Sequence, residues 1–198
     1  MDPFEAIRAE IIADEMNSAL GRIGYVPVYT THPEAKIAII SQAPGIKAQE
    51  SQTPWNDVSG RLLRQWLDVS DADFYDPTKF AIIPMDFYYP GKGAHGDLPP
   101  RKGFADKWHK PIFDLMPKIE LSILVGSYAQ KYYLGKNIGN NLTATVRDYQ
   151  RYLPKFFPLV HPSPLNYGWR KRNPWFETEV VTDLKSHVRR ILADSTEA

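Results

Sequence analysis

The sequence contains no cysteine among its 198 residues. A chain without thiols forms no disulfide, no thiolate metal site and no cysteine-held iron–sulfur cluster, and it has no thiol nucleophile. Any chemistry at its site must therefore come from oxygen and nitrogen groups. The same absence fits a reducing compartment.

Signals for export and for membrane insertion are also missing. The first 16 residues are acidic and have a helical pattern, without the cationic start and apolar centre of a signal peptide. No later segment is apolar enough to span a bilayer. We therefore expect a cytoplasmic protein with no membrane partner.

An excess of one charge is lacking as well, because 24 basic residues stand against 23 acidic ones, giving a net charge of +1. Domains that bind nucleic acid often show a strong basic balance. If DNA is the partner, the basic residues that contact it must be gathered locally.

Short apolar runs and helical patterns alternate along the chain. The runs resemble buried strands and lie at residues 36–41, 80–84, 121–126 and 157–161. Helical patterns cover residues 4–20, 59–67, 106–116, 128–134 and 175–192. This order predicts an α/β fold of three αβα layers around a central, mainly parallel four-stranded sheet. We expect one domain over residues 1–198, with an N-terminal helix at about 4–20 and a core at about 36–192.

Two of the predicted strands end in proline turns with polar residues beside them. The first turn reads Ser41-Gln42-Ala43-Pro44-Gly45, and the second begins at His161 and reads HPSPLN. In an open α/β sheet both turns face one crevice, so His161 and the backbone amides of the first turn are expected to meet over one ligand. Taken singly, each is also an ordinary turn.

These segments resemble the signatures of the uracil-DNA glycosylase superfamily. HPSPL is similar to the second signature, and SQAPG resembles the first, which reads Gly-Glu-Ala-Pro-Gly in several branches. Pro54-Trp55, followed by Ser59-Gly60-Arg61-Leu62-Leu63, is similar to the stretch that carries the stacking aromatic. The similarity runs from about residue 36 to 192. Residues 89–93 and 96–101 resemble a bacterial subgroup, here without iron–sulfur cysteines.

The resemblance implies a site that receives a nucleotide turned out of DNA, because a base inside a duplex cannot be reached. The flipped base would stack on Trp55 and contact Ala43, Pro44 and Gly45. His161 would donate a hydrogen bond to the base carbonyl, where negative charge develops as the glycosidic bond breaks. The alternative for His161 is a histidine that merely caps a strand.

The group that orients the attacking water is less clearly marked, because Ala43 stands where many members carry an aspartate. Asp57 in Asp-Val-Ser-Gly resembles the catalytic aspartate of a broad-specificity branch, and Gln42 and Glu50 are weaker candidates. A helix N-cap explains Asp57 equally well.

The residue expected to recognise the base also differs from the family pattern, since no asparagine follows the second strand. Asp86 lies there instead, either as an acceptor for a base N–H or as a turn residue.

The residues after His161 suit contacts with DNA. The resemblance makes Leu165 the wedge that fills the gap left by the extruded nucleotide, the alternative being a buried core leucine. Ser163, Pro164 and Asn166 surround it. Arg170, Lys171 and Arg172 follow and either hold phosphates or form a solvated charge run.

We therefore expect a monofunctional DNA glycosylase that hydrolyses the bond between deoxyribose and uracil or another deaminated base. It would act as a monomer on damaged DNA, initiating base-excision repair without metal or cofactor. The alternative is a weak or inactive member that binds damaged or single-stranded DNA, since the signature aspartate and asparagine are replaced. The other histidines show no metal-ligand spacing.

Overall fold

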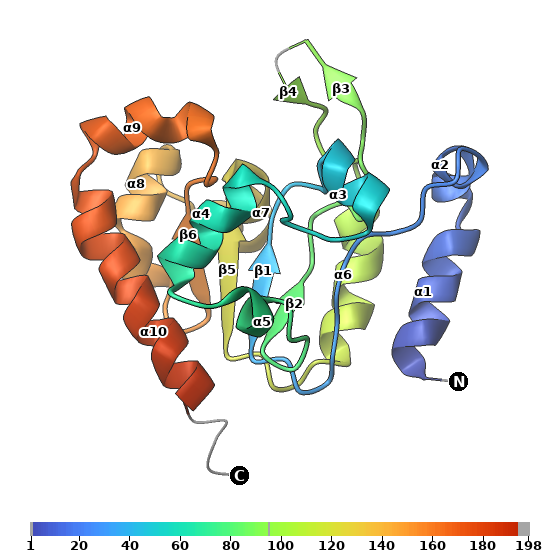
Figure 1. Ribbon diagram of the computed structural model, residues 1–198, viewed down its shortest axis with the longest axis horizontal. Coiled ribbons are helices and arrows are strands. Elements are labelled where there is room, and N and C mark those ends of the chain that lie inside the picture. Colours follow the sequence, from blue (N-terminus) through green and yellow to red (C-terminus); the bar gives the residue numbers. More distant parts are fainter. Residues whose placement is uncertain (1, 95, 194–198) are drawn as a thin grey trace.

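A computed structural model describes residues 2–94 and 96–193, and it has three layers (Figure 1). The central sheet contains β1 (Ile37–Ile40), β2 (Phe80–Ile82), β5 (Leu121–Val125) and β6 (Phe156–Leu159). Its strands run in the order β2-β1-β5-β6, and every neighbouring pair is parallel. The expected α/β fold with a central four-stranded sheet is confirmed.

The strands are buried on both faces, as a parallel sheet covered by helices requires. In β1 all four side chains are buried, and successive residues point to opposite faces. Ile37 and Ile39 belong to one apolar cluster, whereas Ala38 and Ile40 belong to another. The continuous apolar runs of the sequence therefore arise because the sheet has a core on each side.

Helices cover the two faces. One face packs against α4 (Val58–Leu67) and α10 (Val181–Ala193), which bring Leu63, Trp66 and Leu184 to the sheet. The other face packs against α6 (Phe104–Asp114) and α7 (Ser127–Leu134). Before α10, residues Phe176–Val180 form a π-helical turn, so the helix expected from 175 begins as a wider turn.

The N-terminal helix is shorter than expected. It ends as α1 at Ala13, and a 3₁₀ helix (Glu15–Asn17) and α2 (Ser18–Arg22) follow. Asp14 causes the break, because its backbone is extended and its carboxylate accepts a hydrogen bond from the Met16 N–H at 3.0 Å. This side chain caps the next helix instead of continuing the first.

Several short elements had no counterpart in the expectation. They include a hairpin of β3 (Lys92–Gly93) and β4 (Gly96–Asp97), which Figure 1 shows projecting above α3 at the end of the sheet. The short helices are α3 (Ile46–Ser51), α5 (Asp71–Phe74), α8 (Leu142–Arg147) and α9 (Tyr167–Arg172). Four-residue to six-residue helices and two-residue strands are too short to give a periodic signal. Within the described part of the chain, no helix is long and apolar enough to cross a membrane.

Candidate active site

A cleft of about 530 Å³ lies at the carboxyl ends of the strands. It brings together three segments that are far apart in the sequence: the turn after β1, residues 54–59, and the turn after β6. The expected site residues that line it are Gln42, Ala43, Pro44, Gly45, Trp55, Asp57, His161, Ser163 and Leu165. The two proline turns therefore do face one crevice, as parallel strands predict.

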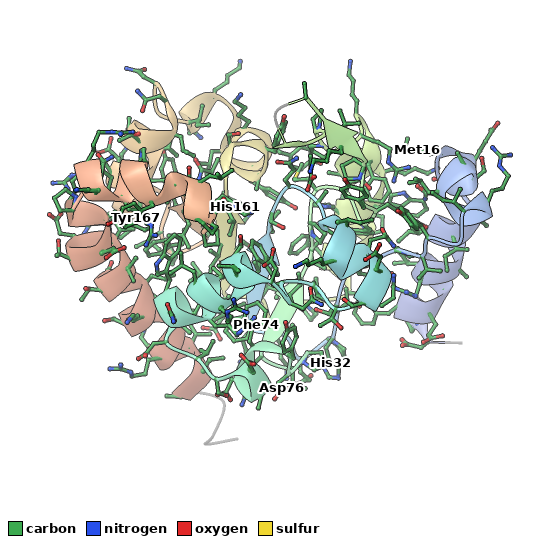
Figure 2. All side chains as sticks on the ribbon, turned by 45° about the horizontal axis from the view of Figure 1, so that its top comes forward. Met16, His32, Phe74, Asp76, His161 and Tyr167 are labelled. Carbon is green, nitrogen blue, oxygen red and sulfur yellow. The ribbon has the colours of Figure 1, made fainter. Side chains whose placement is uncertain are left out.

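His161 stands just after β6, beside the end of β5. A Cβ placed on Gly126 would lie 3.9 Å from the Cβ of His161, so the two strand ends are close. Burial lowers the pKa of His161, although the nearby charge of Asp57 acts in the opposite direction. The imidazole is therefore neutral near pH 7, with one N–H to donate. Figure 2 shows His161 near the middle of the molecule, with Tyr167 farther out on the α9 side.

Trp55 forms the neighbouring wall of the cleft. Its ring is stacked on His161, with ring centroids 5.5 Å apart and an angle of 30° between the planes. The backbone at Trp55 has φ +59°, a left-handed conformation that is costly for an aromatic residue. The surrounding structure must therefore hold it in place.

Two neighbours, Arg64 and Tyr75, hold the platform segment, which we define as residues 54–60. Arg64 Nη1 donates to the Trp55 carbonyl at 3.1 Å, and the Tyr75 hydroxyl donates to the Pro54 carbonyl at 3.0 Å. A Cβ on Gly60 would lie 1.7 Å from the Trp55 oxygen, so the carbonyl fits only because residue 60 is glycine. The glycine of the Ser-Gly motif thus shapes the wall of the cleft.

Asp57 caps a helix and also lies in the cleft. Its Oδ1 accepts a hydrogen bond from the Gly60 N–H at 2.8 Å, so the N-cap interpretation is confirmed. The same side chain is exposed and lines the cleft. Oδ2 has no hydrogen-bond partner among the described residues. One oxygen therefore holds α4, and the other is free for a ligand or a water.

The first turn is tied to its surroundings mainly through Gln42. Its Nε2 donates to the Leu98 carbonyl at 2.8 Å, just beyond the β3–β4 hairpin. Its backbone carbonyl accepts from the Asp86 N–H at 3.1 Å. The side-chain carbonyl is the part of this amide left for a ligand, while the side chain of Ala43 is only a methyl group.

Asp86 does not lie in the cleft. Its carboxylate is fully buried and forms a bidentate pair with Arg101, with Nε–Oδ2 at 2.7 Å and Nη2–Oδ1 at 2.8 Å. The Tyr88 N–H adds a hydrogen bond at 3.0 Å, and Arg101 Nη1 reaches the Met16 carbonyl. The expectation of a base acceptor is therefore wrong, whereas the turn interpretation is confirmed, because Asp86 accepts from the N–H two residues further on in the bend after β2. Arg101, which Asp86 holds, ties this turn to the N-terminal segment. Glu50 is exposed on α3 and is also absent from the lining of the cleft.

The second turn continues into the loop segment, which we define as residues 163–172. Leu165 is 94% exposed at the edge of the cleft, so it is not a core leucine. Ser163 Oγ accepts from the Leu165 N–H at 3.2 Å, and Asn166 Nδ2 donates to the His161 carbonyl at 2.8 Å. The polar residues around Leu165 therefore shape the turn that presents it. Pro164 is exposed in the same 3₁₀ turn.

The basic cluster at the end of the loop segment divides into two parts. Lys171 and Arg172 are exposed. Arg170 is mostly covered, pairs with Glu177 at 2.9 Å and lies 5.9 Å from the ring centre of Trp66. Arg170 thus has a structural role, whereas Lys171 and Arg172 carry the exposed positive charge.

Sequence reasoning missed Asp97, which also lines the cleft. It lies on β4, in a stretch of glycines and polar residues without an apolar pattern. Asn56 and Lys47 are further polar residues of the lining. Over residues 2–94 and 96–193, no three acidic or histidine side chains are grouped so as to hold a metal ion.

Compared with known protein families, the chain matches the Uracil DNA glycosylase superfamily over residues 28–185. The match spans every strand of the central sheet and both proline turns. The chain belongs to the uracil-DNA glycosylase superfamily, a glycosylase class associated with base-excision repair and DNA binding.

Proposed function

We propose that this protein is a monofunctional DNA glycosylase that hydrolyses the N-glycosidic bond of uracil or another deaminated base in DNA. The observation that carries the proposal is the convergence of Trp55, a neutral His161 and Asp57 on one cleft. These are an aromatic platform, a hydrogen-bond donor and a carboxylate, the three groups that this reaction requires.

In the proposed reaction the target nucleotide leaves the duplex and its base stacks on Trp55. The C1′–N bond breaks, and its electron pair moves onto the base, whose carbonyl oxygen accepts the N–H of His161. A donor aimed at this oxygen stabilises the transition state more than the ground state, because the negative charge grows as the bond lengthens.

The deoxyribose becomes positively charged in the same step. Asp57 Oδ2 stabilises this positive charge and orients a water molecule. The water oxygen forms the new bond to C1′, and a water proton passes to the carboxylate or to solvent. The departing base is protonated by solvent. No metal or organic cofactor enters the scheme.

The loop segment would hold the DNA in place. Leu165 is exposed at the edge of the cleft, in a turn that the Ser163 hydroxyl caps, so it suits the space left in the base stack. Lys171 and Arg172 would contact phosphates, since they are the exposed cations beside it.

The test is a cleavage assay on single-stranded and duplex DNA containing uracil, hypoxanthine or xanthine, with abasic sites revealed by alkali. We expect alkali-sensitive product from at least one base, with equal yield in EDTA. If DNA binds but no abasic site forms on any substrate, the protein is instead a catalytically silent DNA-binding member. The replaced aspartate at Ala43 favours that second candidate.

A further inference from the structure

Asp97 brings a second carboxylate to the cleft from an unrelated element. It is the last residue of β4, and its partner in the hairpin register is Lys92. A Cβ placed on Gly45 would lie 3.9 Å from Asp97 Oδ2, so the carboxylate borders the first proline turn. Asp97 thus forms part of the cleft wall, and Figure 1 shows its hairpin next to α3.

The position of this carboxylate is fixed relative to the first turn. The Leu98 carbonyl accepts the Gln42 amide at 2.8 Å, and the Leu98 N–H donates to the Gly91 carbonyl at 2.9 Å. These two hydrogen bonds close the base of the hairpin and tie it to the end of β1. Asp97, one residue before Leu98, is therefore held at the cleft.

No structural role accounts for the Asp97 carboxylate. Among the described residues, no lysine or arginine is within ion-pairing distance of it, and its hydrogen-bond partner is the Tyr89 hydroxyl at a long 3.5 Å. Asp57 caps a helix and Asp86 binds Arg101, but Asp97 caps no helix and pairs with no described cation. The Asp97 carboxylate is therefore available to accept a hydrogen bond from a ligand.

Asp97 and His161 enter the cleft from different sides. His161 follows β6, which is one edge of the sheet, whereas Asp97 borders the turn after β1. β5 lies between these two strands. Figure 1 shows the hairpin and α9 on opposite sides of the end of the sheet where the cleft lies. A base whose carbonyl faces His161 therefore presents its far edge towards Asp97.

We infer that Asp97 is a specificity-determining residue, whose carboxylate accepts a hydrogen bond from an N–H on the edge of the flipped base away from His161. This inference rests on the proposed function. A carboxylate offers only acceptors, so it favours a ring N–H or an amine at that edge and disfavours a carbonyl. Asp97, which lies outside both signature turns, would thus select bases that carry a hydrogen-bond donor at this edge.

The test compares Asp97→Asn with the unchanged protein in single-turnover cleavage of uracil, hypoxanthine and xanthine DNA. The amide keeps one acceptor and adds a donor, so the ratio of rates between two of these bases should change by about fivefold or more. Asp114→Asn is the matched control, because Asp114 is an exposed carboxylate paired with Lys110 on α6 and lies outside the lining of the cleft. It should leave the ratios unchanged.

Equal losses on all three bases would overturn the inference, because such a result places Asp97 at the water or the sugar. Unchanged rates on all three would overturn it as well. Neither outcome affects the proposed function, which depends on the cleavage by the unchanged protein.

A binding measurement tests the base-reading role of Asp97 independently of the proposed glycosylase activity. DNA carrying the same bases on 2′-fluorinated deoxyribose resists cleavage, since the fluorine opposes positive charge on the sugar, and its equilibrium affinity can be measured directly. We expect Asp97→Asn to change the relative affinities for these oligonucleotides even if the unchanged protein cleaves nothing. Identical relative affinities would contradict a base-reading role.

Discussion

The platform segment and the loop segment border the same cleft but are held very differently. The Trp55 backbone has a left-handed conformation, and Arg64 and Gly60 lock its carbonyl in place. The loop segment instead exposes Leu165 by 94% and Tyr167 by 63%. The wall that Trp55 forms is thus fixed without any ligand, whereas the surface next to it exposes apolar side chains, as surfaces that bind a partner often do.

This difference predicts different effects of mutations in the two segments. Changes that disturb the backbone or the packing of the platform segment should alter stability and chemistry together, because its shape depends on packed neighbours. Changes at the exposed side chains of the loop segment, such as Leu165, Lys171 and Arg172, should alter DNA binding and leave folding intact, because these side chains support little else. The following predictions test that difference from the largest expected effect to the smallest.

The largest effect is expected at His161, which joins the two segments. Replacing His161 with alanine should slow single-turnover cleavage by about a hundredfold or more, since one donor to the developing charge is lost. The thermal unfolding midpoint should change little. Activity within about threefold of the unchanged protein would show that another group supplies the donor.

The same histidine predicts a pH dependence for the unchanged protein. Since burial lowers the pKa of His161, its neutral form persists to a pH below the ordinary value of 6.5. The cleavage rate should therefore stay level from pH 8 to 7 and fall only as acid protonates the ring below pH 6.5.

Asp57→Asn should lower the cleavage rate by about a hundredfold, which is the low end for loss of a general base. Asparagine is as good an N-cap as aspartate, so α4 should keep its cap and the unfolding free energy should stay nearly constant. Asp57→Ala serves as the comparison, because it loses both the carboxylate and the cap. A normal rate in Asp57→Asn would leave the residue with the capping role alone.

Gly60→Ala should destabilise the fold by about 2 kcal/mol, because the new methyl group would overlap the Trp55 carbonyl. Urea unfolding measures this loss, and cleavage should weaken as Trp55 shifts. Gly21→Ala is the matched control, since a Cβ there has no neighbour within 4 Å. Equal stability of the two variants would mean that the platform segment is not locked as described.

Leu165→Ala should reduce cleavage of duplex DNA by roughly tenfold and of single-stranded DNA much less, because only a duplex has a stack to hold open. Unfolding should be unaffected, given the exposure of this side chain. The informative quantity is the ratio of the two rates. An equal loss on both substrates would place Leu165 at the base instead of in the stack.

The smallest effect in ordinary buffers is expected from Lys171→Ala combined with Arg172→Ala. If each cation neutralises one phosphate, the slope of log affinity against log salt should become shallower by about 2. Arg170 is kept, because its pairing with Glu177 would mix a stability loss into the result. An unchanged slope would remove these two residues from the DNA surface.

Much of the architecture was predictable from local pattern. The four apolar runs marked β1, β2, β5 and β6 because a sheet with a core on both faces requires continuous apolar residues. The N-cap at Asp57 was also local, since an aspartate before an apolar helical pattern satisfies the first free N–H groups. The convergence of the two proline turns followed from the parallel direction of the strands.

Local pattern was less informative at the N-terminus and in the hairpin. Asp14 interrupts an otherwise helical pattern because its carboxylate finds a nearby N–H, and short polar strands carry no periodic signal. The expected helix over 4–20 therefore ends at Ala13, and β3 and β4 were not foreseen.

The sequence by itself determined the three-layer sheet, the family and the positions of Trp55, His161 and Leu165, because these depend on local pattern and on motifs. Tertiary structure alone decided which of the aspartates after the second strand faces the cleft. Asp86 and Asp97 both follow the second strand, yet the first is buried against Arg101 and the second lines the cleft. A carboxylate is available to a ligand only where no cation already pairs with it, and that depends on contacts between residues distant in the chain.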